Sequence, residues 1–365
     1  MPKVLILCAH RPGRSPSQRY RFEQYLDFLK NNGFDFTWSY LLNEADDKIF
    51  YSPGHFLDKV KIILRSIATR KKDAATLSMY DIIFIQREAH FLGNSRFERK
   101  AFKSGAKVIF DFDDSIWIPD TSPGNAKWAW LKKAEKFFDN IKYAHVVIAG
   151  NPFLAEKASF VNKNTVIIPT TINCDWHIPK HELRHKEKVC IGWSGSISTI
   201  KHFEMLLPVL KKIKEKYLDK VQFRIIGQEN YLNSELEVKS VQWSEKTEVD
   251  ELNRMDIGLM PLPDDEWANG KCGLKGLSYM ACGIPTIMSK VGVNKMIIEN
   301  GLNGYLAVTE EDWYRLLCLL IEDIDLRVKI GELGRKTVLE KYSVEKNKAK
   351  YLEIFQNPTK QFNES

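Results

Sequence analysis

Short apolar runs of the kind that form buried strands alternate along this chain with stretches of helical periodicity, and the alternation occurs twice. The first series begins with a run over residues 4–8 and a helical stretch over 20–29. The second begins with a run over 189–193 and a helical stretch over 202–217. Because parallel strands need long crossover connections, usually helices, the pattern predicts two α/β domains, each with a parallel sheet.

Further runs complete both series. Apolar runs lie at 34–40, 81–85, 107–112, 145–149, 165–168, 221–226, 257–261 and 285–289, and helical stretches at 96–104, 245–255 and 274–281. The segment 169–188 is polar, contains two prolines and has no clear period. A chain of 365 residues suits two domains. We predict a first Rossmann-like domain over 1–172, a linker over 173–188 and a second Rossmann-like domain over 189–341, with a C-terminal helix within 342–365 that packs back on the first.

Composition narrows the class of protein. No run of about 18 uncharged apolar residues is present, which argues against a membrane span, and the N-terminus lacks a signal-peptide cleavage pattern. The six cysteines are scattered without a C-x-x-C pair, as is typical of reduced thiols in a cytoplasmic protein. The net charge of +7 favours anionic partners, among which nucleotide diphosphates, anionic membranes and nucleic acid all have the right sign.

The segment 270–275 is a small-residue loop that leads into a predicted helix. The free N–H groups at such a helix end carry about half a positive charge and bind phosphate well. Lys271 and Lys275 add two full charges at the same place. The alternative interpretation is a solvated loop before a helix that Gly283 ends.

A second loop, over 192–196, follows the run at 189–193 and has the same character. Gly195 lets the backbone approach a pyrophosphate, Ser196 offers a hydroxyl donor, and Lys201 at the next helix offers a charge. Glycine at a strand-to-helix turn often serves geometry alone, so one such loop is weak evidence. Two in one domain favour phosphate binding.

These residues carry a family resemblance. The span from Ile191 to Tyr305 resembles the donor-binding half of the group 1 (family four) glycosyltransferases, which have the GT-B architecture of two Rossmann-like domains facing across a cleft. The segment 195–201 resembles that family's G-x-x-x-x-x-K loop, in which the lysine contacts the donor diphosphate. The segment 280–285 resembles its A-M-A-x-G-x-P helix end, and 300–304 its N-G-x-x-G turn. The first half is similar more loosely, through its strand–loop pattern and residues 167–169.

The sequence departs from the family pattern at the donor loop. Two glutamates usually stand seven residues apart there, and Gly270 and Ser278 occupy those places. Ser196 stands where the family usually has an arginine. The loop Gly-Lys-Cys-Gly-x-Lys is similar to that of a bacterial branch of the family, in which Lys271 and Lys275 would compensate for the lost charge.

The resemblance implies an enzyme that moves a sugar from a nucleoside diphosphate sugar to a glycan or lipid-linked saccharide acceptor, with retention of configuration, in cell-surface polysaccharide or glycoconjugate synthesis. It implies no metal and no cofactor. The donor-binding residues it implies are Gly13, Gly195, Ser196, Lys201, Lys271, Cys272, Gly273, Leu274, Lys275 and Ser278. The rival hypotheses are a non-catalytic sugar-nucleotide-binding protein of the same fold and a sugar-nucleotide epimerase. Nucleic acid is not expected as a partner, because no recognition module accompanies the basic residues.

Basic residues also follow strands of the first domain. Arg14 and Arg19 lie in an arginine-rich loop over 10–21, and Arg87 and Glu88 follow the run at 81–85. We expect these four residues to contact the acceptor or phosphates. A solvated basic loop, and a pair between Arg87 and Glu88 themselves, are the alternatives.

Asp113 and Asp114 follow the run at 107–112. A carboxylate here can accept a proton from the acceptor hydroxyl or hold a sugar hydroxyl, so both are predicted catalytic residues. The alternative is a cap for the next helix.

The segment 58–72 predicts an amphipathic, strongly basic helix whose apolar stripe is Val60, Ile63, Leu64 and Ile67. Most such helices pack that stripe on a core. The basic residues, with Trp128 and Trp130 further along the chain, also suit peripheral contact with the inner face of a membrane.

Overall fold

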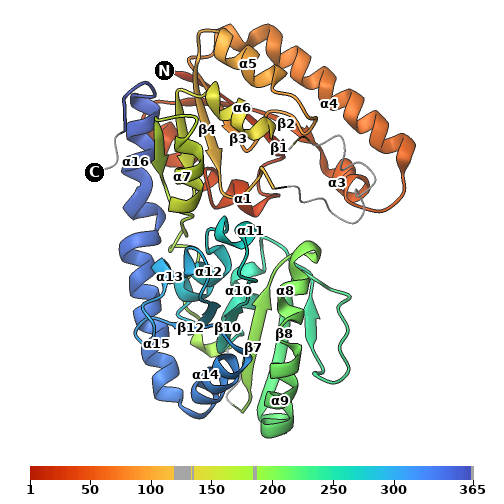
Figure 1. Cartoon of the computed structure of the whole chain (residues 1–365), viewed down its shortest axis with the longest axis vertical. Helices are drawn as coiled ribbons and strands as arrows, with labels where there is room; N and C mark the ends of the chain where they lie inside the picture. Colours follow the sequence, from red (N-terminus) through yellow and green to blue (C-terminus); the bar gives the residue numbers. More distant parts are fainter. Residues whose placement is uncertain (119–132, 134, 184–186, 363–365) are drawn as a thin grey trace. The chain divides into compact units, whose positions relative to one another are not determined.

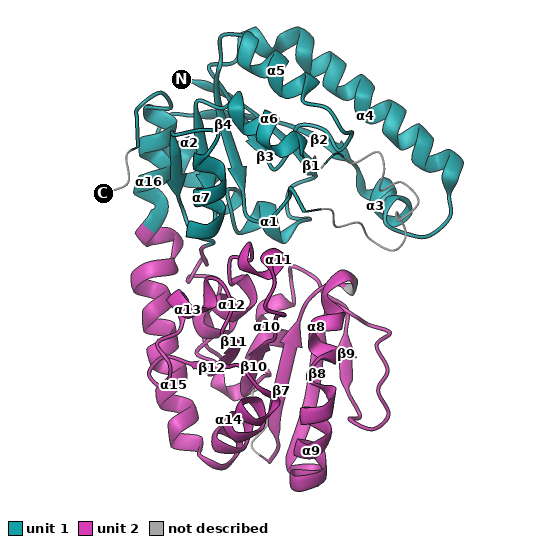
Figure 2. Cartoon of the chain, in the orientation of Figure 1, with its two compact units in different colours: residues 1–170, 347–365 teal, residues 171–346 magenta. Residues whose placement is uncertain are grey.

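The protein was analysed as a computed structural model that describes residues 1–118, 133, 135–183 and 187–362. The chain forms two compact units, one of residues 1–170 with 347–365 and the other of residues 171–346 (Figure 2). The predicted linker at 173–188 belongs to the second unit.

The first unit is built on a six-stranded parallel sheet with strand order β2-β1-β3-β4-β5-β6 (Figure 1). Its strands are β1 (Lys3–His10), β2 (Asp35–Leu42), β3 (Ile82–Gln86), β4 (Lys107–Phe112), β5 (Val146–Ala149) and β6 (Thr165–Ile167). All six predicted runs of this half form strands. Those at the centre are buried almost throughout, as expected for a parallel sheet covered on both faces.

The helices of the first unit are α1 (Pro16–Arg19), α2 (Leu26–Asn31), α3 (Glu44–Phe50), α4 (Phe56–Thr76), α5 (Arg96–Lys103), α6 (Lys136–Lys142), α7 (Pro152–Ser159) and most of α16 (Val344–Gln356). The helix predicted over 20–29 is a 3₁₀ turn (Glu23–Tyr25) followed by α2. The last helix, α16, begins in the second unit and passes into the first after Lys346.

Two aromatic side chains fix α16 in the core of the first unit. Tyr351 stacks on Tyr25 with ring centroids 4.2 Å apart, and its hydroxyl donates to the Arg21 carbonyl at 2.6 Å. Phe355 stacks on Phe84 of β3 at 5.9 Å. The first unit therefore needs residues from both ends of the chain.

The stripe predicted for the basic helix is only partly its buried face, since Val60, Ile63 and Ile67 are half-buried. The buried residues of α4 are Lys59, Ile62, Ser66 and Arg70, and Leu64 is 61% exposed. Polar side chains point inward because the fold supplies their partners. Arg70 donates to the Cys8 carbonyl at 2.8 Å and to Ser39 Oγ at 2.7 Å, and Ser66 Oγ lies 2.8 Å from His90 Nε2.

The second unit has another six-stranded parallel sheet, with order β12-β11-β10-β7-β8-β9. Its strands are β7 (Val189–Ser194), β8 (Val221–Ile226), β9 (Lys239–Val241), β10 (Ile257–Met260), β11 (Thr286–Ser289) and β12 (Tyr305–Ala307). The two short edge strands, β9 and β12, were not predicted. Each has three residues, too few for a recognisable pattern.

The helices of this unit are α8 (Ile200–Glu204), α9 (Leu207–Tyr217), α10 (Glu248–Asn253), α11 (Glu266–Asn269), α12 (Leu274–Ala281), α13 (Asn294–Ile297), α14 (Glu310–Glu322) and α15 (Ile324–Thr337). The single helix predicted over 202–217 is divided into α8 and α9. Pro208 lies in the first turn of α9, where a proline ring is tolerated, and it disfavours a continuous helix through the residues before it.

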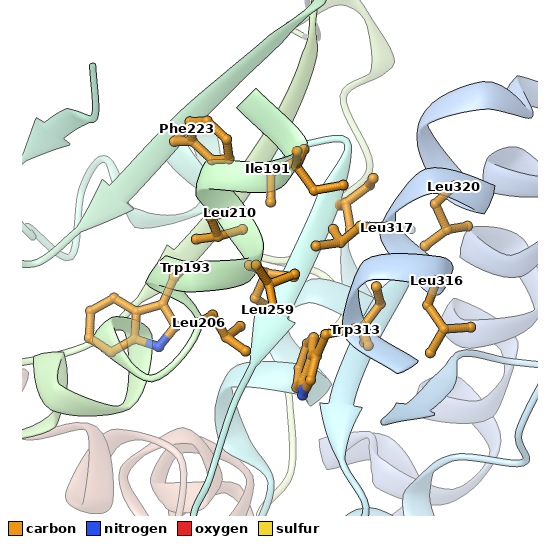
Figure 3. Close-up of a cluster of buried hydrophobic side chains, with 14 of the residues drawn as sticks. Ile191, Trp193, Leu206, Leu210, Phe223, Leu259, Trp313, Leu316, Leu317 and Leu320 are labelled. Carbon is orange, nitrogen blue, oxygen red and sulfur yellow. The ribbon is translucent and has the colours of Figure 1, made fainter. Parts of the chain in front are cut away.

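Side chains on the two faces of this sheet form separate cores. Ile191 and Trp193 of β7 belong to a cluster with Leu210 of α9 and Leu317 of α14 (Figure 3). Cys190, which directly precedes Ile191, belongs to a second cluster with residues of α10 and α12. The alternation along β7 therefore places helices on both faces of the sheet, as in a Rossmann-like domain.

All six cysteines are free thiols. No helix in the described ranges combines the length and the apolar character that crossing a membrane requires.

Candidate functional site

The strand order of the second unit reverses between β7 and β10. These strands pair in parallel, with Ile191 opposite Ile257. Ligands of open α/β sheets bind beyond the carboxyl ends of the strands at such a reversal. The segments that follow β7 and β10 carry all the predicted donor-binding residues except Gly13.

The segment after β7 is a tight turn. The Gly195 N–H donates to the Ile226 carbonyl at 2.9 Å, and a Cβ at Gly195 would overlap the Trp193 indole. The Ser196 N–H donates to Thr199 Oγ1 at 3.1 Å. These contacts direct the chain into α8, whose second residue is Lys201.

The segment after β10 ends at the N-terminus of α12. Gly273, the residue before this helix, has φ of +73°, a left-handed conformation that favours glycine. A Cβ there would also overlap Ile297. Because Gly273 has no side chain to cap α12, the first N–H groups of this helix, including those of Leu274 and Lys275, suit an anion.

Trp267 of α11 connects lysines from the two segments. Lys271 Nζ lies 3.6 Å from the centroid of the Trp267 ring, and Lys201 Nζ lies 5.8 Å from it. The ring of His202 is 5.2 Å from the same indole. The structure thus places Lys201 and Lys271 around one aromatic ring, although they are far apart in sequence.

Lys275 lies beside a second indole. Its Nζ is 4.9 Å from the centroid of the Trp193 ring and 3.5 Å from Thr199 Oγ1. Burial, and then the charge of Lys271, lower the pKa of Lys275 to about 7. Among the residues that the structure describes, neither Lys201 nor Lys275 has a carboxylate oxygen within 4.0 Å. The lysine cluster of Lys201, Lys271 and Lys275 therefore suits a multiply charged anion.

A buried hydrogen bond joins the two segments. The Tyr279 hydroxyl of α12 accepts the Ser194 N–H at the end of β7, at 2.7 Å. Burial raises the pKa of Tyr279 to about 12, so the phenol stays protonated at neutral pH. This bond holds α12 against β7 and fixes the spacing of the lysines.

Two predicted donor-binding side chains have other partners. Ser278 Oγ donates to the Leu274 carbonyl of its own helix at 2.9 Å. The buried Cys272 thiol lies 3.8 Å from the Gly270 carbonyl. Sequence reasoning also missed two residues of the site, Trp267 and His202. The signals were present, because Trp267 stands four residues before Lys271 and His202 directly follows Lys201.

Arginines after β1 in the first unit are paired within the protein. Arg11 and Arg14 both form ion pairs with Asp47 of α3, Arg14 at 3.0 Å. Although burial opposes it, the hydrogen bond from His10, the charge of Arg14 and the hydrogen bond from Arg11 lower the pKa of Asp47.

The remaining predicted residues of this loop are also occupied. The Gly13 N–H donates to Glu23 Oε2 at 2.8 Å. Arg19 is buried, with its guanidinium 5.2 Å from the centroid of the Tyr20 ring. The fourth arginine of the loop, Arg21, pairs with Asp111 at 2.6 Å, and both side chains are fully buried. The role of Arg21 is therefore structural.

Arg87, Asp113 and Asp114 come together at the carboxyl ends of β3 and β4. Arg87 Nη2 lies 2.8 Å from Asp113 Oδ1 and 3.7 Å from Asp114 Oδ2. Glu88 instead pairs with Lys136 of α6, at 2.6 Å. The alternative in which Arg87 and Glu88 pair with each other is therefore wrong, because each has a closer partner on another element.

Two further features bear on the predicted partners. Apolar and basic residues share the exposed face of α4, namely Phe56, Leu57, Lys61, Leu64, Arg65, Lys71 and Lys72. Trp128 and Trp130 lie outside the described residues. In the described part of the chain, no group of three or more His, Cys, Asp or Glu side chains is arranged to hold a metal ion.

The sequence and fold of the chain are similar to those of known proteins. Residues 188–323 match the family model described as Glycosyl transferases group 1. No curated protein matches the sequence.

Several solved structures share the fold over nearly the whole chain. The sucrose-phosphate synthase of Thermosynechococcus elongatus superposes with a TM-score of 0.71 at 14% identity, covering 98% of this chain and 99% of the other. HepE of Anabaena, in complex with UDP and glucose, gives 0.65 at 13% identity over 98% and 99%. A glycosyltransferase of Rickettsia africae gives 0.66 at 15% identity over 97% of each.

At these identities the structures establish the fold, which is α/β with two Rossmann-like domains of the GT-B type. The family match covers the segments that carry the lysine cluster. Together, the comparisons show a GT-B fold for the whole chain and similarity to the group 1 glycosyltransferases over residues 188–323.

Proposed function

We propose that this protein transfers a sugar from a nucleoside diphosphate sugar to a glycan or lipid-linked saccharide acceptor, in the synthesis of a cell-surface polysaccharide or glycoconjugate. The observation that carries the proposal is the lysine cluster at the uncapped N-terminus of α12. The family match over 188–323 and the UDP and glucose bound by HepE support it.

The cluster suits the charge that develops during sugar transfer. As the bond between sugar and diphosphate breaks, negative charge grows on the departing diphosphate. Lys201, Lys271, Lys275 and the N–H groups at the start of α12 stabilise that charge. This set of donors lets transfer proceed without a metal ion or cofactor.

On the acceptor side we propose Asp113 and Asp114. A carboxylate near the acceptor hydroxyl accepts its proton or orients the sugar, and Arg87 holds both side chains in place. The reaction would retain the anomeric configuration, with the departing diphosphate assisting removal of the acceptor proton.

The missing glutamates favour one rival function. Gly270 and Ser278 stand at positions where the family usually has carboxylates, and Ser278 is bonded to its own helix. A non-catalytic protein that binds sugar nucleotides would have the same lysine cluster. Release of free nucleoside diphosphate that depends on an added acceptor separates the enzyme from this rival and from an epimerase.

The first test is a binding titration with UDP-, GDP-, dTDP- and CMP-linked sugars, in which calorimetry measures the heat of binding. One nucleoside diphosphate sugar should bind, and Lys201→Ala should weaken it roughly tenfold or more because a charged hydrogen bond is lost. Lys212→Ala is the matched control, since Lys212 is an exposed lysine of α9 outside the cluster. Equal affinity in wild type and Lys201→Ala would contradict the proposed geometry.

We further propose a cytoplasmic location with peripheral contact at the inner membrane face, through the exposed side of α4. Phe56, Leu57 and Leu64 would enter the interface, while Lys61 and Lys71 contact anionic headgroups. Sedimentation with phosphatidylglycerol vesicles tests this, and Leu64→Ser together with Lys61→Ser should abolish it. Binding that is unchanged in the double variant would reject the surface.

A further inference from the structure

His202 lies inside the donor site and had no predicted role. It directly follows Lys201 in α8, its side chain is 2% exposed, and its ring contacts Trp267. Neither ring nitrogen has a hydrogen-bond partner among the described residues. Both nitrogens are therefore buried and unsatisfied.

Such a position is costly in a folded protein. Leaving a buried donor or acceptor unpaired costs about 1–3 kcal/mol, and the great majority of buried polar groups have partners. The charged groups that act most strongly on His202 come from α8, α12 and the segments just before α11 and α12. They are Lys201, Lys275 and Lys271, opposed by the carboxylate of Asp265. An anion among the lysines is the partner that this environment favours.

We infer that His202 is a further binding residue for the donor diphosphate, donating a ring N–H to a phosphate oxygen and taking up one proton from solvent as the diphosphate binds. This inference rests on the proposed function, because it needs the diphosphate in the lysine cluster. The His202 ring is covered in the free protein and contacts the half-buried Trp267, so neighbouring side chains must shift for the ligand to reach it.

The charges around His202 set the pH range of the effect. Burial, followed by the charges of Lys275, Lys201 and Lys271, lowers the pKa of His202 to about 4, so the free ring is neutral at pH 7. Two phosphate charges offset the three lysines and raise that pKa. The proton is therefore taken up between about pH 4 and the pKa of the bound form, and affinity rises as pH falls through this range.

The experiment measures proton uptake directly. UDP-glucose and GDP-glucose are titrated by calorimetry near pH 6 in buffers of different ionisation enthalpy. These two probes carry fully ionised diphosphates at that pH, so protons taken up enter the protein. Wild type should take up about one proton with the probe that binds. His202→Phe should take up only the small fraction that Lys275 contributes at this pH, and it should bind roughly tenfold more weakly.

Two variants separate binding from structure. His202→Phe fills the same space without polar atoms, so the free protein should melt at the wild-type temperature or above it. His202→Gln keeps an N–H donor that does not titrate, so it should bind more tightly than His202→Phe and lose the acid-side pH dependence. A structural histidine predicts the opposite pattern, with a lower melting temperature in His202→Phe and unchanged binding.

The failure of the inference differs from the failure of the proposed function. Wild type that binds without proton uptake, and with equal affinity in His202→Phe, overturns the role of His202 and leaves the donor site intact. Wild type that binds neither probe overturns both. If His202→Phe does not fold, His202→Gln with wild-type pH dependence is the result that rejects the inference.

Discussion

Both sheets have charged side chains at the carboxyl ends of their strands, but the cations differ in whether carboxylates pair with them. At the carboxyl ends of the first sheet, cations have carboxylate partners, as in Arg21 with Asp111 and Arg87 with Asp113. At the corresponding edge of the second sheet, Lys201 and Lys275 have none among the described residues.

The difference separates structural charges from charges that bind a ligand. A buried cation paired with a carboxylate is stable without a ligand, and losing its partner is costly. Lys275 is half-buried without a carboxylate partner among the described residues, which raises the free energy of the folded protein, and an anion that binds there recovers the difference. We therefore expect an anionic ligand to bind at this edge of the second sheet and not at the paired charges of the first.

The largest effect should come from breaking the buried pair of the first unit. Asp111→Ala leaves Arg21 buried without its carboxylate and should lower the free energy of unfolding by about 3–5 kcal/mol. Chemical denaturation measures it. The control is Asp27→Ala, which removes an exposed ion pair at 3.1 Å and should cost less than about 1 kcal/mol. Similar losses in the two variants would refute the structural role of the buried pair.

The next effect should separate catalysis from donor binding. Asp113→Asn removes a carboxylate of the first unit and should lower kcat about 100-fold, because the acceptor proton loses its base. The donor Kd should not change, since the lysine cluster is intact. Asp114→Asn, measured beside it, shows which carboxylate acts. Reduced donor affinity with unchanged kcat would assign these carboxylates to the donor.

In the second unit, Lys275→Met should weaken donor binding roughly tenfold or more, without lowering the melting temperature. The methionine keeps the packing beside Trp193 and removes the repulsion from Lys271. A melting temperature that falls while binding stays unchanged would show that Lys275 is structural.

The same lysine predicts a pH dependence. Its lowered pKa of about 7 means that the free side chain loses its proton as pH rises through neutrality. An anion binds the protonated form, so the contribution of Lys275 to donor affinity should be constant below about pH 7 and fall above it, separate from the acid-side rise assigned to His202. Lys275→Met should not show this fall. Titrations from about pH 6 to 9 would contradict the assignment if wild type and variant fell equally.

The smallest effect should come from Arg14→Ala. Asp47 already offsets the charge of Arg14, so donor affinity should change less than about twofold and the free energy of unfolding by less than about 1 kcal/mol. A tenfold loss of affinity would show that Arg14 leaves Asp47 to bind phosphate, and the comparison between the two units would then fail.

The strands were largely predictable because buried parallel strands are short, continuous apolar runs, as at β4 and β8. The inward face of α4 was not, because Arg70 and Ser66 are buried by partners on β1, β2 and the segment after β3. The periodicity of apolar residues along a sequence predicts only those buried helix faces that are apolar.

The candidate site, like the fold, was predictable only where local sequence patterns determine it. The lysine cluster follows from glycine-rich loops after strands, which are visible in the sequence. The contact of His202 with Trp267 depends on how α8 and α11 pack, and 65 positions of sequence numbering separate these residues. Likewise, no local pattern shows that Arg87 pairs with Asp113 and not with Glu88.

The placement of α16 has a consequence for synthesis on the ribosome. The second unit consists of one continuous segment, 171–346, whereas the first needs Tyr351 and Phe355 to complete its core. The second unit can therefore finish folding while the first, although translated earlier, still exposes the surface that α16 covers. A released chain that ends before residue 351 would contain the whole second unit and an incomplete first unit, whose exposed core is a target for chaperones.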